Sequence, residues 1–198
     1  MLPVLLVRHA RTADNAARVL VGRRDVPLDE EGRHQADRLC ARLAPLAPAA
    51  VYVSPLQRAV QTVAGLGDAV LVPELLEVHH GAIEGLQEER LRAEWGPFLE
   101  RWRRDPERVV IPGGESLGQA VSRALPALEA IARRHQPPGP VVVCCHQMII
   151  AGLLCAIQAL PLSRYHELTS RNTGINLVGW REGRWEVFVT DDVAHLDG

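Results

Sequence analysis

Two apolar stretches of this 198-residue chain end in a histidine, and an arginine precedes one of these histidines. Residues 4–7 lead into Arg8 and His9, and residues 141–145 lead into His146. Short apolar runs of this kind are typical of strands that are buried on both faces of a sheet. The polar side chains then lie at the carboxyl ends of strands, where open α/β sheets place their sites.

A second arginine follows another predicted strand, over residues 51–53. Ser54 and Pro55 come next, and we interpret them as an N-cap and a proline at the first helical position. Arg58 then falls in the first turn of a helix. Because the carboxyl ends of parallel strands meet at one edge of a sheet, we expect Arg58 to join the arginine and the histidines described above.

Two arginines and two histidines in one crevice suit phosphoryl transfer. Guanidinium groups can neutralise phosphate oxygens, and a neutral imidazole can attack phosphorus as a nucleophile. A carboxylic acid must then protonate the leaving alkoxide, and Glu77 and Glu84 are the candidates nearby in the sequence. All cationic side chains other than histidine are arginines, which excludes Schiff-base lysine chemistry and the P-loop lysine.

Other hydrolase chemistries can be compared with the sequence. No cysteine has an arginine six positions later, as cysteine phosphatases require, and no Asp-x-Asp motif of aspartyl phosphatases occurs. One Gly-x-Ser-x-Gly motif, residues 114–118, resembles an esterase nucleophile elbow, with Asp191 or Asp192 and His195 as partners. The apolar run before it is short and interrupted, so we interpret Ser116 as the N-cap of a helix.

The rest of the sequence alternates strands with helices. We expect helices near residues 30–43, 87–104, 116–134 and 148–159, and further strands at 70–72, 175–180 and 185–190. This order predicts an α/β fold with a largely parallel sheet covered on both faces. We expect a single domain, with residues 84–112 as a helical excursion over the carboxyl edge of the sheet.

Composition limits the partners. The formal net charge of −2 argues against general nucleic-acid binding, and no apolar run approaches the ~18 residues of a membrane span. The start of the chain lacks the features of a signal peptide, so we expect a cytoplasmic protein. The four cysteines form no Cys-x-x-Cys pair, which favours buried, reduced thiols over a metal site.

Six motifs in order resemble the histidine phosphatase (phosphoglycerate-mutase-like) superfamily. They are Leu6–Ala10 with Asn15, residues 22–28, residues 54–62, residues 76–85, Gly113–Ser116, and the strand that ends at His146. The resemblance extends from Leu5 to about Asn176. It implies one histidine phosphatase domain over residues 1–198, built as a three-layer α/β/α sandwich with a mostly parallel mixed sheet and a small helical cap.

The resemblance also implies a role for each matching residue. His9 would be the phosphorylated nucleophile, and Arg8, Arg58 and His146 would hold the phosphoryl group. Glu77, in preference to Glu84, would give a proton to the leaving group. Further substrate-binding candidates are Asn15, Gly22, His80, Gln147 and His195. No cofactor and no metal is implied.

The short excursion and the absence of lysine favour hydrolysis over mutase chemistry. Residues 77–81, 102–116 and 194–196 resemble metal-independent phosphoserine phosphatases, so a phosphoserine-like metabolite is the first candidate substrate. An α-ribazole phosphatase and a cofactor-dependent phosphoglycerate mutase are alternatives. A non-catalytic relative that binds phosphorylated ligands is an alternative of another class. The terminal hairpin could offer an edge for a homodimer.

Overall fold

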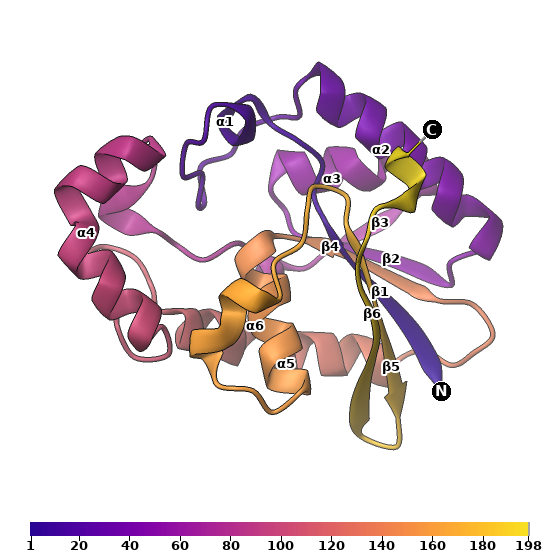
Figure 1. Cartoon of the computed structure of the whole chain (residues 1–198). Coiled ribbons are helices and arrows are strands. Elements are labelled where there is room, and N and C mark those ends of the chain that lie inside the picture. The colour runs from indigo at the N-terminus through magenta and orange to yellow at the C-terminus, as the bar shows by residue number, and fades with distance from the viewer. Residues whose placement is uncertain (198) are drawn as a thin grey trace.

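The computed structural model describes residues 1–197, which form a six-stranded sheet with helices on both faces (Figure 1). The strand order is β3-β2-β4-β1-β5-β6. Strands β3, β2, β4 and β1 are parallel, whereas β5 and β6 add antiparallel pairings. The strands are β1 Leu2–Arg8, β2 Ala50–Val53, β3 Ala69–Leu71, β4 Val141–Cys145, β5 Ile175–Arg181 and β6 Arg184–Asp192. The predicted mixed α/β sheet is confirmed.

Two pairs of helices cover the two faces of the sheet (Figure 1). Helices α2 and α3 pack on one face, and α5 and α6 pack on the other. The helices are α1 Ala13–Ala16, α2 Glu30–Leu43, α3 Gln57–Val63, α4 Glu88–Arg104, α5 Leu117–Arg133 and α6 Gln147–Ile157. The longer helices lie close to the expected positions. Within residues 1–197, no helix combines the length and apolar content needed to cross a membrane.

Alternate side chains of the central strands enter two separate cores, as the pleat of a strand requires. Leu5 and Cys144 belong to the core under α2 and α3, whereas Leu6 and Cys145 belong to the core under α5 and α6. This two-sided burial explains why β1 and β4 have continuous apolar sequences. All four cysteines are free thiols, and three of them are buried.

The register of the central strands places the two histidines side by side. Strand β1 pairs with β4 so that Arg8 lies opposite Cys145. The backbone N–H of His9 donates to the carbonyl oxygen of Cys145 over 2.9 Å. His9 and His146 therefore follow the ends of neighbouring strands and lie at the same level of the sheet, at its carboxyl edge.

Ser54 does not cap a helix, and this prediction is wrong. Helix α3 begins at Gln57, and its N-cap residue, Leu56, makes no side-chain capping bond. Leu56 has an extended backbone, which delays the start of the helix beyond the reach of Ser54. The Ser54 hydroxyl lies 2.7 Å from Nε2 of His146 instead. Arg58 still falls in the first turn of α3, as expected.

Ser116 is the N-cap of α5, as the sequence predicts. Its Oγ accepts from the backbone N–H of Gln119 over 3.0 Å, and the Gln119 side chain accepts from the Ser116 N–H over 2.9 Å. The hydroxyl also donates to the carbonyl oxygen of Glu107 over 2.8 Å. Because Ser116 is 1% exposed and its hydroxyl proton is bonded, the geometry is unlike that of an esterase nucleophile.

Replacement of Ser116 by alanine tests this assignment. Loss of the cap should lower the free energy of unfolding by about 1 kcal/mol, with little effect on turnover of phosphate esters. Urea denaturation and initial rates on p-nitrophenyl phosphate are the measurements. A folded Ser116→Ala protein that had lost ester cleavage would contradict the capping role.

Candidate active site

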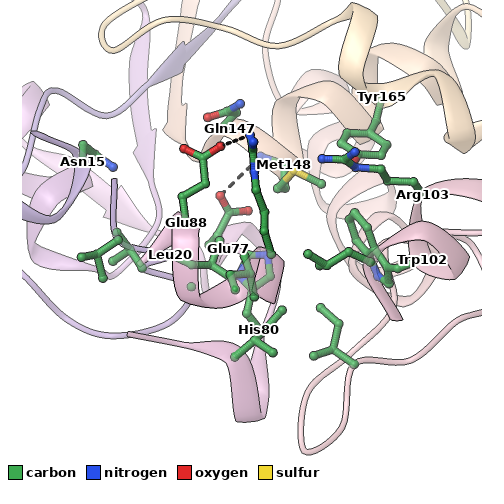
Figure 2. Close-up of a pocket in the computed structure, with 18 of the residues that line it drawn as sticks. Asn15, Leu20, Glu77, His80, Glu88, Trp102, Arg103, Gln147, Met148 and Tyr165 are labelled. Atoms are coloured by element: carbon green, nitrogen blue, oxygen red, sulfur yellow. Dashed lines mark hydrogen bonds and ion pairs between the residues drawn. The ribbon is translucent and has the colours of Figure 1, made fainter. Parts of the chain in front are cut away.

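A cavity of about 450 Å³ opens at the carboxyl edge of the parallel strands (Figure 2). Eight of the ten predicted site residues line it, and they come from widely separated parts of the chain. These eight are Arg8, His9, Asn15, Gly22, Arg58, Glu77, His80 and Gln147. The other two, His146 and His195, do not line the cavity. The ring of His146 nevertheless lies beside that of His9, with 5.3 Å between the ring centroids.

The environment of His9 selects one tautomer. Its Nδ1 lies 2.7 Å from the carbonyl oxygen of Ala10. A carbonyl can only accept, so Nδ1 carries the proton and Nε2 keeps its lone pair. Burial, followed by the charges of Arg58 and Arg8, holds the pKa of His9 well below its usual value. The imidazole is therefore neutral near pH 7 and has a free nucleophilic nitrogen.

The two arginines are fixed by carbonyl groups. Arg58 is 1% exposed and donates through Nη1 to Arg24 O over 2.8 Å and through Nη2 to Gly22 O over 2.7 Å. Arg8 donates through Nη1 to Ser170 O over 2.7 Å. In both residues Nε has no partner among residues 1–197. The carbonyls orient the guanidinium groups without neutralising them.

Both arginines still carry their charge near neutral pH. Burial lowers the pKa of Arg8 to about 10 and also lowers the pKa of Arg58. The negative charge of Glu77 opposes this lowering more than that of any other acidic residue at both arginines. Arg58 is buried and Arg8 is half-buried, and neither forms an ion pair among residues 1–197. This arrangement favours the binding of an anion such as phosphate.

His146 places a second imidazole against His9 and near the two arginines. Its Nε2 contacts the Ser54 hydroxyl at 2.7 Å, and its buried Nδ1 has no partner among the described residues. Burial, followed by the charge of Arg58, lowers its pKa well below the usual value. A neutral His146 whose Nε2 accepts from Ser54 presents Nδ1–H as a donor.

The surroundings of Glu77 raise its pKa and so favour the protonated carboxyl group. Its Oε1 accepts from the Val78 N–H over 2.9 Å, and its Oε2 accepts from the Met148 N–H over 3.3 Å. Figure 2 shows the carboxyl group facing the cavity. Burial raises the pKa of Glu77, although these bonds and the nearby arginines lower it. The arrangement can therefore supply a carboxylic acid beside a bound phosphate ester.

The comparisons with known proteins agree with this geometry. The model of the histidine phosphatase superfamily (branch 1) matches residues 4–192. The chain belongs to this superfamily. It is 34% identical to "Probable phosphoglycerate mutase GpmB" of Erwinia tasmaniensis, over 100% of this chain and 96% of that protein. It is 31% identical to "Metal-independent phosphoserine phosphatase" of Arabidopsis thaliana, over 98% of this chain and 82% of that protein.

A solved relative has the same fold. The mycobacterial glucosyl-3-phosphoglycerate phosphatase, solved in complex with VO3, matches with a TM-score of 0.89 and 26% identity. The match covers 96% of this chain and 99% of that chain. The predicted superfamily, its phosphoglycerate-mutase-like fold and its phosphatase class are confirmed.

Glu84, the rival acid of this histidine phosphatase, has a structural position instead. Its Oε1 accepts from the backbone N–H of Arg23 over 3.0 Å and from that of His80 over 2.9 Å. Gly22 packs against it with φ +57°, and a Cβ at Gly22 would lie 2.3 Å from Glu84 Oε1. The glycine is therefore required by both its backbone conformation and this contact. Glu84 does not line the cavity.

Asn15, in α1, and Gln147, in α6, both line the cavity (Figure 2). The side-chain Oδ1 of Asn15 accepts from the Thr12 N–H over 3.2 Å and from Asn172 Nδ2 over 3.4 Å. These two bonds leave the Asn15 amide N–H groups free to donate to a ligand. Gln147 is the first residue of α6, where unpaired backbone N–H groups also favour an anion.

The two remaining histidines differ in position. His80 is buried against the cavity, and burial lowers its pKa to about 4, so it is neutral near pH 7. His195 lies behind the end of β1, with Nε2 3.0 Å from Oγ1 of Thr173. The Thr173 N–H donates to Arg8 O over 3.1 Å. The structure does not bring His195 into the cavity, so substrate binding by this residue has no geometric support.

Two positioning residues have no assigned role in the sequence analysis. Thr62 Oγ1 accepts from the Ala10 N–H over 2.8 Å and donates to Arg58 O over 2.6 Å. Asn172 Nδ2 donates to His9 O over 2.9 Å. Thr62 lies within the motif of residues 54–62, whereas nothing in the sequence near Asn172 indicates a link to His9. Only the fold brings Asn172 to the nucleophile.

A charged cluster holds the backbone of Glu77. Glu115 Oε1 accepts from Arg23 Nη2 over 2.9 Å, from Arg123 Nη2 over 2.6 Å and from the His79 N–H over 2.9 Å. Both arginines also donate to Glu77 O, each over 3.1 Å. The Gly-Glu-Ser motif therefore anchors the loop that carries the acid. Among residues 1–197, no group of three or more potential ligands is arranged to hold a metal ion.

Replacement of Glu115 by glutamine should weaken this cluster. Burial opposes ionisation of Glu115, but bonds from Arg123 and from the His79 N–H produce a net lowering of its pKa. A lowered pKa in the folded state stabilises the protein above the ordinary value of 4.5, and this stabilisation is lost as the pH falls through the folded pKa. We expect a loss of about 1–3 kcal/mol at pH 7 that shrinks below about pH 4.5.

Urea denaturation at pH 7 and at pH 3.5 measures the effect. Glu100→Gln, at an exposed position of α4, is the matched control and should change stability little at either pH. An equal loss of stability for Glu115→Gln at both pH values would contradict the electrostatic role.

Proposed function

We propose that this chain hydrolyses phosphate monoesters of small metabolites through a phosphohistidine at His9. The observation that carries the proposal is the neutral imidazole of His9, with its Nε2 free, beside the buried guanidinium group of Arg58 and the half-buried one of Arg8. Glu77, the carboxyl group whose charge most raises the pKa of both arginines, has a raised pKa itself and does not fully neutralise them. A phosphate dianion supplies the missing charge.

In the first step, the non-bridging oxygens of the ester accept from Arg8, Arg58 and His146. His9 Nε2 attacks phosphorus, and the bond from phosphorus to the alcohol oxygen breaks. Glu77 transfers its proton to the departing alkoxide, so a neutral alcohol leaves. The bond from His9 Nδ1–H to Ala10 O stabilises the positive charge that the phosphorylated ring acquires.

In the second step, a water molecule attacks the phosphorus atom of the phosphohistidine. The Glu77 carboxylate takes a proton from this water, which restores the carboxylic acid. The N–P bond breaks and returns its electron pair to His9 Nε2. Inorganic phosphate leaves, and the protonation states return to those of the starting enzyme.

Phosphoglycerate mutase activity is a second candidate, because a relative of 34% identity carries that name. A mutase must retain a second phosphate group on the intermediate. The cavity outside the anion site contains two further arginines, and one of them, Arg92, is paired with Glu88. Only Arg103 then remains for a second phosphate, which favours hydrolysis.

We also infer that residues 84–112, which include α4, act as a cap on a single histidine phosphatase domain. A small phosphate ester is the expected partner. The homodimer and the cytoplasmic location stay predictions from the sequence. Among substrates, phosphoserine is the candidate that the resemblance favours, and α-ribazole phosphate is the alternative.

Replacement of His9 by alanine should abolish turnover, with a loss of at least about 10³-fold, because the nucleophile is removed. A ³²P-labelled ester should transfer its label to the wild-type protein and not to the variant. His34→Ala, at an exposed position of α2, is the matched control and should keep both activity and label. Turnover or labelling that survived in His9→Ala would contradict the proposal.

The non-catalytic alternative is tested in the same assay. Absence of phosphate release from p-nitrophenyl phosphate at every pH between about 5 and 9 would favour a binding protein. Binding of inorganic phosphate without hydrolysis would then be measured by calorimetry.

The pH dependence of kcat/KM should report on Glu77. The first step needs the protonated acid, so the rate should fall as the pH rises through a pKa above the ordinary 4.5. Glu77→Gln should remove this alkaline limb and lower kcat by about 10²–10⁴-fold on alkyl phosphates. The loss should be smaller on p-nitrophenyl phosphate, whose leaving group needs less protonation. An unchanged alkaline limb in the variant would assign the proton to another group.

A further inference from the structure

The cavity has two chemically different halves. The inner half contains the anion site at Arg8, His9 and Arg58. The outer half lies between α4, α6 and the loop around residue 20, and it is walled mainly by apolar side chains (Figure 2). Six members of this apolar wall are Leu20, Leu91, Phe98, Leu99, Trp102 and Met148.

The apolar wall is a fixed surface at one end. The rings of Trp102 and Tyr165 meet edge to face, with 5.3 Å between their centroids. Trp102 is buried in the core, and Tyr165 comes from a different part of the chain, the short helix Leu162–Glu167. Figure 2 shows both rings on the same side of the cavity. This aromatic corner offers an apolar surface to a ring or an aliphatic chain.

The outer half offers few free charges to a polar ligand, and its unpaired polar atoms include the ring nitrogens His80 Nδ1 and Trp102 Nε1. Glu88 and Arg92 are hydrogen-bonded to each other, so their charges are already matched. His80 is neutral near pH 7, because burial lowers its pKa to about 4. Arg103 lies beside Tyr165 and has no ion pair among the described residues. An amino-acid head group would find one exposed cation and no free carboxylate for its ammonium group.

We propose that the alcohol part of the substrate is apolar, an alkyl or arylalkyl group of about four or more carbons that packs against the apolar wall. The inference rests on the proposed hydrolysis of phosphate monoesters and specifies which esters are preferred. Phosphate oxygens bind the arginines, and the body of the alcohol displaces water from the leucine and aromatic side chains. Phosphoserine, the substrate favoured by sequence resemblance, is then a poor one.

A series of esters with leaving groups of similar basicity tests the inference. Ethyl, butyl, hexyl and 2-phenylethyl phosphate are compared with O-phosphoethanolamine and O-phosphoserine. We expect kcat/KM to rise about two- to fourfold for each added methylene, since each one leaves water for an apolar surface. We also expect 2-phenylethyl phosphate to exceed phosphoserine by at least about tenfold.

Variants of the apolar wall test whether these side chains cause the preference for larger apolar alcohols. Leu99→Asn and Phe98→Ala change half-buried side chains of α4. Each should weaken the rise of kcat/KM with chain length, with about a fivefold or greater loss for hexyl phosphate. Ethyl phosphate should change less than about twofold. Leu71→Asn, at an exposed position of β3, is the matched control and should leave the whole series unchanged. Thermal melts verify that each variant is folded, so either wall variant can decide the result.

The outcomes separate the two proposals. Hydrolysis of all esters at equal rates, or a preference for phosphoserine that Arg103→Gln removes, would overturn the apolar substrate class and leave the hydrolytic mechanism standing. Failure to hydrolyse any ester would overturn the proposed function itself. A rising series that Leu99→Asn or Phe98→Ala flattens would support the inference.

Discussion

The positive charge of the buried Arg58 and the half-buried Arg8 is the constraint on which the site depends. Carbonyl oxygens of Gly22, Arg24 and Ser170 hold the two guanidinium groups without supplying a formal negative charge. Placing cations in a low-dielectric interior costs free energy unless an anion joins them. The two guanidinium groups therefore favour a bound anion, and a phosphate group is the ligand that we propose there.

The same burial sets the protonation states of the other groups. It holds His9 and His146 neutral by lowering their pKa values, and it raises the pKa of Glu77. The charges of Arg8 and Arg58 lower the pKa values of the two histidines further, and they oppose the rise in the pKa of Glu77. A neutral imidazole and a carboxyl group of raised pKa thus line one cavity, as the proposed first step needs.

Backbone hydrogen bonds turn this electrostatic arrangement into a defined geometry. Thr62 joins the Ala10 N–H to the carbonyl of Arg58, and Asn172 donates to the carbonyl of His9. Glu115 anchors the loop of Glu77 through two arginines. Each link connects segments that are far apart in the chain, so His9, the two arginines and Glu77 keep their relative positions.

The sequence alone determined the two buried strands, the helix start at Ser116 and the residue types that meet at the strand ends, because these depend on local periodicity and capping. It misassigned Ser54, whose hydroxyl contacts His146 only because β2 and β4 are neighbours. Tertiary structure also decided that His195 lies outside the cavity and that the apolar side chains of α4 line it. Local patterns show that a side chain is buried, but only packing decides what it is buried against.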